Sequence, residues 1–212
     1  MAVRFKKDFT LCIAGSSGMG KTWLVLELLR NADKCMEALP SQIIICYGCE
    51  QPFYDEFKGL GYPVTLHKGI MKKDPPSGSL IIFDDLQHEA DKILPYFTKL
   101  AHHLGVSVVY ITQNIFLKQN RNLTLNSNYI ILFSSWRDKK QISTLASQID
   151  PNNTSWIIKS YKSATQTPFS YLMFDFTPKT PDELRLRDNI IPEITHYYVD
   201  DSAYPIFDLN EL

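Results

Sequence analysis

The chain has 212 residues, a formal net charge of −1, 44% hydrophobic residues and 21% charged residues. These values are typical of a globular protein with one sizeable core, and the length predicts one or two domains. The near-neutral charge argues against a strongly basic protein that coats nucleic acid, and no apolar run approaches the roughly 20 residues of a membrane span. Residues 1–8 are short and basic and run directly into an apolar segment, so we expect no signal peptide and an intracellular protein.

The most specific pattern is the segment from Gly15 to Thr22, which matches G-x-x-x-x-G-K-[ST] without a gap. The apolar run 9–14 predicts a buried strand before it, and the run 22–30 predicts a helix after it. In that setting, backbone N–H groups point at a polyphosphate, the lysine contacts the outer phosphates and the hydroxyl binds Mg²⁺. We therefore expect Thr22 to be a metal ligand within a nucleotide-binding loop of Gly15, Ser16, Ser17, Gly18, Met19, Gly20, Lys21 and Thr22.

Predicted strands and helices alternate along the rest of the chain, which is typical of a mainly parallel α/β sheet flanked by helices. Further strands are predicted at 42–47, 64–66, 80–83, 106–112, 128–133 and 171–176. Helices are predicted at 52–60, at 86–104 with a kink near Pro95, at 137–149 and at 155–164. Segments 71–79 and 113–126 are interpreted as polar connectors, and the proline-rich, acidic stretch from Thr177 onward as a tail.

Two aspartates follow the apolar strand 80–83, which is the pattern of a Walker B strand end. Asp84 is expected to hold Mg²⁺, either directly or through water. Asp85 stands where an ATPase needs a base that polarises the attacking water. Two alternatives stay open for this position: Asp85 caps the following helix, or Glu89, one helical turn further on, is the base.

The strand 106–112 ends at Gln113, whose amide can contact both a phosphate oxygen and the attacking water. ATPases with an additional strand between the Walker A and Walker B strands carry a γ-phosphate sensor at this place. Gln113 is therefore the expected sensor, with a simple turn as the alternative. Arginine is scarce, and Arg121 and Arg137 both follow this strand. Each is either a finger that reaches a neighbouring subunit's nucleotide or an exposed, solvated charge.

This ordered set of motifs, together with the segment 121–133 and the Arg137-Asp138 helix, resembles viral genome-packaging ATPases of the FtsK/HerA superfamily. The similarity is greatest to the poxvirus-type packaging ATPases of adenovirus-like and Polinton-like elements. It covers residues 9–192, so we expect a P-loop ATPase domain over 1–192 and a C-terminal tail over 193–212. The chain departs from the family before Arg137, where a Lys and a Pro are common and this sequence has Ser134-Ser135-Trp136.

The resemblance implies an ATP- and Mg²⁺-dependent motor that drives double-stranded DNA into a capsid. It implies a homo-oligomeric ring, a pentamer or a hexamer, docked on capsid vertex proteins, with no membrane involved. Such a motor would lie in the host cytoplasm or nucleus or be associated with the virion. The catalytic residues would be Lys21, Asp85, Gln113, Arg121 and Arg137, and the metal ligands Thr22 and Asp84.

Double-stranded DNA would be gripped through its phosphates and not read by sequence. The candidate grips are Lys72, Lys73, Lys118 and Arg121, although lysine-rich loops are also common as plain solvated surface. Two other functions stay open from the residues alone. One is a P-loop nucleoside or nucleotide kinase, and the other is a non-hydrolytic ATP-binding scaffold.

Overall fold

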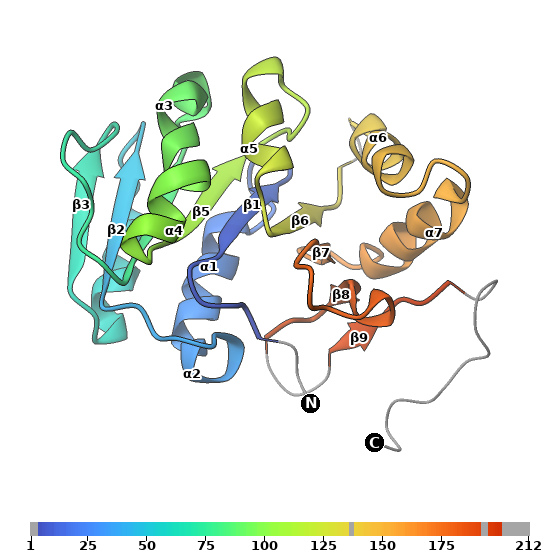
Figure 1. The fold of residues 1–212 in the computed structure, drawn as a ribbon, viewed down its shortest axis with the longest axis horizontal. Helices are drawn as coiled ribbons and strands as arrows, with labels where there is room; N and C mark the ends of the chain where they lie inside the picture. Colours follow the sequence, from blue (N-terminus) through green and yellow to red (C-terminus); the bar gives the residue numbers. More distant parts are fainter. Residues whose placement is uncertain (1–3, 136–137, 192–194, 201–212) are drawn as a thin grey trace.

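The computed structural model describes residues 4–135, 138–191 and 195–200, which form a nine-stranded sheet with helices on both faces (Figure 1). The strands are β1 (Thr10–Ala14), β2 (Gln42–Tyr47), β3 (Val64–Lys68), β4 (Ser79–Asp84), β5 (Ser107–Thr112), β6 (Tyr129–Phe133), β7 (Tyr171–Asp175), β8 (Leu186–Asp188) and β9 (His196–Tyr197). The α-helices are α1 (Lys21–Arg30), α2 (Ala32–Cys35), α3 (Ala90–Pro95), α4 (Ala101–Leu104), α5 (Arg121–Leu125), α6 (Lys140–Ile149) and α7 (Thr154–Ala164). The other helical segments are the 3₁₀ turns η1 (Pro52–Leu60), η2 (Gln87–Glu89), η4 (Lys118–Asn120) and η5 (Asp182–Leu184), and the π-helix η3 (Tyr96–Leu100).

The strand order is β3-β2-β4-β5-β1-β6-β7-β8-β9, parallel from β3 to β6 and antiparallel from β6 to β9. β5 lies between β1 and β4, with Ile13 opposite Ile111 and Ile82 opposite Val109. This confirms the predicted mainly parallel sheet and the additional strand between the Walker A and Walker B strands. Because β1, β4 and β5 are parallel, the loops that follow them leave the sheet at the same end, the carboxyl end of these strands. That end is where ligands bind in open α/β sheets.

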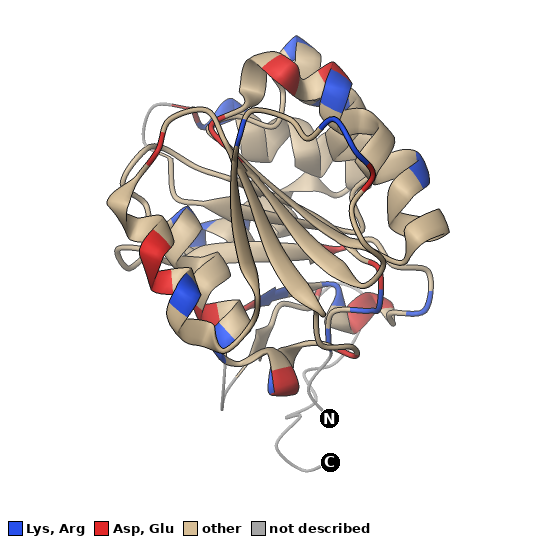
Figure 2. Cartoon of the chain, turned by 90° about the vertical axis from the view of Figure 1, so that its left-hand side faces the viewer, with Lys and Arg blue, Asp and Glu red and all other residues tan. Residues whose placement is uncertain are grey.

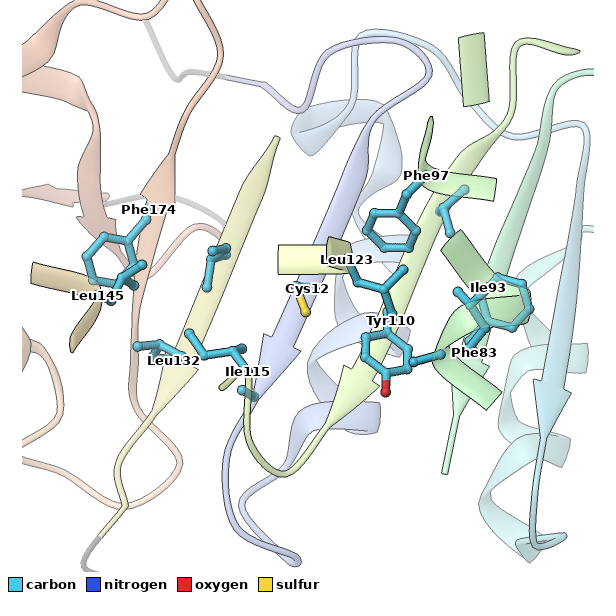
Figure 3. Close-up of a cluster of buried hydrophobic side chains, with 14 of the residues drawn as sticks. Cys12, Phe83, Ile93, Phe97, Tyr110, Ile115, Leu123, Leu132, Leu145 and Phe174 are labelled. Carbon is cyan, nitrogen blue, oxygen red and sulfur yellow. The ribbon is translucent and has the colours of Figure 1, made fainter. Parts of the chain in front are cut away.

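Two apolar clusters hold the helices against opposite faces of the sheet. On one face, α1, α2 and η1 pack through residues such as Leu28 and Phe57 onto Ile13 and Ile43. On the other face, the helices from α3 to α7 pack onto alternate strand residues such as Cys12. Both faces are therefore covered, which explains why the central strands are continuously apolar. Figure 3 shows part of the second cluster, including Cys12, Phe83, Ile93, Phe97, Tyr110, Ile115, Leu123, Leu132, Leu145 and Phe174.

Most charged residues lie outside this layered core, and the buried exceptions among the described residues are Asp84, Asp175 and Arg187. Figure 2, which views the sheet from its β3 edge, shows Lys, Arg, Asp and Glu on the outer surfaces of helices and on the connecting loops. The strands between the helical layers are apolar over most of their length. Among the described helices, none combines the length and the apolar character that crossing a bilayer requires.

Two predicted helices are less regular than expected. The segment Pro52–Leu60 is 3₁₀ throughout and not α-helical. The predicted helix 86–104 is divided into η2, α3, η3 and α4, and its π-helical turn begins directly after Pro95. Proline removes a backbone donor and crowds the preceding turn, which accounts for the irregularity at that point.

The connector and the C-terminal region carry more structure than the sequence indicated. The polar connector 113–126 contains η4 and the helix α5. The helix predicted from residue 137 begins at Lys140, and Arg137 itself lies outside the described residues. After Thr177, β8 and β9 extend the sheet, and β9 lies within the segment predicted as a tail. Strands of three and two residues are too short to give a periodic signal.

Candidate functional site

The loop between β1 and α1 presents the N-terminus of α1 at the carboxyl edge of the sheet. Gly18 and Gly20 have φ angles of 78° and 86°, in the left-handed region that glycine adopts without strain. Gly20 is the N-cap of α1, and no side chain caps that helix. The first N–H groups of α1 therefore keep their donor capacity and the positive end of the helix dipole, which together make an anion site.

Lys21 is folded back over this loop. Its Nζ donates hydrogen bonds to the carbonyl oxygens of Gly15 at 2.7 Å and Ser16 at 2.9 Å. Burial lowers the pKa of Lys21, and the negative charge of Asp84 opposes that shift. The ammonium group thus lies close to both the loop backbone and the Asp84 carboxylate, as a phosphate-contacting lysine requires.

The end of β4 meets the start of α1 through a buried hydrogen-bonded cluster. The Thr22 hydroxyl donates to Asp84 Oδ2 at 3.1 Å, and the Tyr54 hydroxyl donates to the same oxygen at 3.1 Å. Asp84 is 5% exposed and Tyr54 is 1% exposed. Burial raises the pKa of Asp84, while the two hydroxyl donors and the Lys21 charge act in the opposite direction. Burial also raises the pKa of Tyr54, so its hydroxyl remains a donor at neutral pH.

Asp85 differs from Asp84 in both exposure and partners. It is exposed, has a φ angle of 56°, and lines a cavity of about 540 Å³ together with Lys21 and Thr22. Within the described ranges, no hydrogen bond or ion pair occupies its carboxylate, and no side chain caps η2, whose N-cap is Leu86. The helix-cap alternative is therefore wrong. Glu89 is the weaker candidate base, because it pairs with Lys92 at 2.8 Å and does not line the cavity.

Gln113 lies on the same cavity, at the end of β5. The cavity collects most of the predicted site residues from three parallel strand ends, namely Ser17, Gly18, Gly20, Lys21, Thr22, Asp84, Asp85 and Gln113. Gly15 and Ser16 contribute carbonyl groups to Lys21, and Met19 packs against the core instead of lining the cavity. The roles assigned to these residues stay predictions, but their positions are compatible with one nucleotide site.

The two candidate arginines do not complete this cavity. Arg121 is exposed at the start of α5 and does not line it. Arg137 lies outside the described residues. Among the described side chains that line the cavity, Lys21 is the single positively charged one. A second cation at the phosphates would have to come from elsewhere.

The loop after β5 is hydrogen-bonded to α6 and to Asn120, the residue that precedes α5 and Arg121. Gln141 of α6 accepts a hydrogen bond from the N–H of Ile115 at 3.1 Å and donates to the carbonyl of Gln113 at 3.5 Å. Asn120, immediately before α5, donates to Thr112 Oγ1 at 3.0 Å and to the carbonyl of Asn114 at 2.8 Å. The Asn114 side chain also donates to Asp138, next to Arg137 in the sequence.

Thr22 and Asp84 are suitable ligands for Mg²⁺. Their oxygens are 3.1 Å apart at the base of the cavity, and hard oxygen donors are what this ion prefers. In the described part of the chain, no group of three His, Cys, Asp or Glu residues is placed to hold a metal. The donor set therefore fits an ion whose remaining ligands are phosphate oxygens and water, as is usual for Mg²⁺ at nucleotide sites.

The comparisons with known proteins support this reading at the level of fold. No protein-family model and no curated protein matches the sequence. The genome packaging NTPase B204 from Sulfolobus turreted icosahedral virus 2, in complex with sulfate, matches with a TM-score of 0.57 and 13% identity, over 83% of this chain and 95% of that one. This chain has the P-loop NTPase fold.

Two further B204 structures give similar values. The complex with AMP has a TM-score of 0.57 and 13% identity, over 86% of this chain and 96% of B204. The complex with ATP-gammaS has a TM-score of 0.51 and 12% identity, over 85% and 96% of the two chains. At such identities the likeness is one of fold, so the chemistry of this P-loop NTPase fold has to be argued from its own residues.

Two residues at the site, Tyr54 and Trp23, are not among the predicted site residues. No local pattern marks Tyr54, because its hydroxyl meets Asp84, 30 positions further along the chain, only in the fold. Trp23 belongs to the predicted helix 22–30, and it is 53% exposed and lines the cavity. Its place directly after the phosphate loop is the sequence signal that indicates it.

Proposed function

We propose that this chain is an ATP-hydrolysing motor that translocates double-stranded DNA into a viral capsid. The observation that carries the proposal is the contact of Thr22 with Asp84 beside a phosphate loop, on a cavity that Asp85 and Gln113 also line. The likeness of fold to B204, a genome packaging NTPase, over 95–96% of the B204 chain supports the packaging role.

In the proposed site, the phosphates of ATP lie against the N–H groups of Gly15–Thr22, and Lys21 turns from the loop carbonyls toward the outer phosphates. Thr22 and Asp84 would hold Mg²⁺, which would supply positive charge beside the phosphates. Tyr54 orients the Asp84 carboxylate through its hydrogen bond to Oδ2, as residues that contact a metal ligand commonly do.

Asp85 acts as the base for hydrolysis. Its carboxylate faces the cavity without a hydrogen-bonded partner among the described residues, so it is available to accept a proton from water. Gln113 orients that water and contacts the γ-phosphate. The remaining transition-state charge is met by Arg121 or Arg137 of a neighbouring copy in a homo-oligomeric ring. An arginine supplied in this way raises hydrolysis rates by about 10³- to 10⁵-fold.

The motor grips duplex DNA through its phosphates, with Lys72, Lys73, Lys118 and Arg121 as the contacting cations. The first three are exposed: Lys72 and Lys73 follow β3, and Lys118 begins η4 after β5. Because binding to phosphates releases counterions, DNA-dependent activity is expected to fall steeply as the salt concentration rises. The ring would dock on capsid vertex proteins, in the infected cell or on the virion.

Phosphate release measured with and without duplex DNA tests the proposal. DNA-stimulated hydrolysis is expected. Lys21→Ala is expected to abolish turnover, and Asp85→Asn to keep ATP binding while blocking hydrolysis. Lys34→Ala and Asp91→Asn are matched controls on exposed positions of α2 and α3 and should behave as wild type.

Other outcomes would replace the proposal. Transfer of phosphate to a nucleoside or nucleotide acceptor would identify a kinase, and ATP binding without turnover would identify a scaffold. Normal hydrolysis by Asp85→Asn would show that Asp85 is not the base.

A further inference from the structure

Two exposed aromatic side chains flank the phosphate loop. Trp23 is 53% exposed and directly follows Thr22, and Phe169 is 61% exposed in the connection between α7 and β7. Phe169 Cδ1 lies 3.6 Å from the position that a Cβ on Gly20 would occupy. Residues that are 146 positions apart in the sequence (169 − 23) therefore meet at one loop. Isolated exposed aromatics are ordinary, but a pair beside a phosphate site is not.

The backbone at Phe169 is unusual for an aromatic residue. Its φ angle is 64°, in the left-handed region that favours glycine and that bulky residues rarely adopt. Since the ring is mostly exposed, it adds little to the core. Folding alone would favour glycine here, so the presence of a phenylalanine indicates a role for the ring itself. Unfavourable backbone conformations of this kind concentrate at ligand sites.

The two rings border a second cavity next to the phosphate cavity. This second cavity measures about 710 Å³, and Trp23, Phe169 and Tyr171 contribute to its wall. Trp23 also lines the phosphate cavity of about 540 Å³, so the two spaces adjoin at this side chain. A nucleotide whose phosphates lie on the loop extends its base out of the phosphate cavity. The second cavity is the adjoining space with flat aromatic faces.

We infer that Trp23 and Phe169 form the base-binding part of the nucleotide site and stack against a purine. This inference rests on the nucleotide binding in the proposed function and adds the ligand class that the site selects. Stacking on tryptophan and phenylalanine uses the face of the base and increases with its area. Purine nucleotides therefore bind more tightly than pyrimidine nucleotides.

The test compares two ligands that share a phosphate chain, ATP and inorganic tripolyphosphate, by isothermal titration calorimetry. Wild type is expected to bind ATP more tightly. Trp23→Ala and Phe169→Gly are each expected to weaken ATP binding by about tenfold and to leave tripolyphosphate binding unchanged, because one stacked base contributes about this much. Trp23→Phe retains a ring and is expected to lose less than Trp23→Ala.

Folding is controlled within the same set. Alanine at position 23 suits an exposed helix position, and glycine at position 169 suits the left-handed backbone. The Tm of each variant should therefore fall by no more than a few degrees from that of wild type. Unchanged ATP binding in both variants would overturn the inference, as would an equal loss of ATP and tripolyphosphate binding. If wild type bound neither ligand, the proposed function would fail first.

Discussion

The Tyr54 hydroxyl can be removed without changing the shape of the side chain, which makes Tyr54→Phe a direct test of the buried cluster. Tyr54 donates to Asp84 Oδ2 at 3.1 Å, and both side chains are buried. A hydrogen bond to a charged acceptor contributes about 1.5–3 kcal/mol. The variant leaves Thr22 as the remaining hydroxyl donor to that oxygen among the described residues. We therefore expect a loss of about 1.5–3 kcal/mol in the free energy of unfolding, or a fall of about 3–12 °C in Tm.

Urea unfolding of the nucleotide-free protein measures this loss, and Tyr47→Phe is the matched control. Tyr47 is also buried, and its ring centroid lies 5.5 Å from that of Tyr54. Within the described ranges, no hydrogen bond of the Tyr47 hydroxyl to Asp84 is present. Its removal should change the free energy of unfolding by less than about 0.5 kcal/mol, a value typical of sites without a specific interaction.

Mg²⁺ dependence gives a second, independent readout. If Tyr54 orients a metal ligand, the Mg²⁺ concentration for half-maximal ATPase activity should rise by about tenfold or more in Tyr54→Phe. Equal stability of Tyr54→Phe and Tyr47→Phe would refute the energetic argument. An unchanged Mg²⁺ titration would refute the proposed orientation of Asp84.

Two further predictions concern the Asp84 carboxylate and the close contact of Gly48 with the Asp85 backbone. Asp84→Asn should abolish turnover but raise the free energy of unfolding near neutral pH in EDTA. Burial raises the pKa of Asp84 in the folded protein. Wild type therefore loses stability as pH rises from about 3.9, the ordinary pKa of an aspartate, through the folded-state pKa, and the difference in free energy of unfolding between Asp84→Asn and wild type widens over that range. Urea unfolding at several pH values measures this difference, and a difference that does not change with pH would contradict the argument. Gly48→Ala should cost about 1–3 kcal/mol and reduce turnover, because its Cβ would lie 2.3 Å from the Asp85 carbonyl oxygen. Gly59→Ala, with no neighbour within 4 Å, is the control, and equal unfolding midpoints would contradict the clash.

The sequence predicts the central sheet well because local and global signals agree there. Strands β1, β2, β4, β5 and β6 are short, continuous apolar runs, which is what a strand covered on both faces needs. The carboxyl ends of such parallel strands meet at one end of the sheet, so the sequence alone places Lys21, Asp84 and Gln113 near one another, and all three line one cavity.

Features that depend on distant parts of the chain could not be predicted in the same way. Arg187 is 1% exposed and forms an ion pair with Asp175 at 2.9 Å, between β7 and β8. No local pattern distinguishes this buried cation from an exposed one. The same holds for Tyr54 and Phe169, whose significance comes from the residues that the fold places beside them.

The contacts around Gln113 show how the proposed phosphate sensor would act on the loop that follows β5. Among the described residues, no hydrogen bond holds the Gln113 side chain, whereas Gln141 and Asn120 hold the backbone of residues 113–115 and the Thr112 hydroxyl. A γ-phosphate that binds the Gln113 amide would therefore bias the position of a loop attached to both α5 and α6. These are the elements that begin at Arg121 and follow Arg137. In the proposed ring, gain and loss of one phosphate contact would therefore shift α5, which begins at Arg121, together with α6.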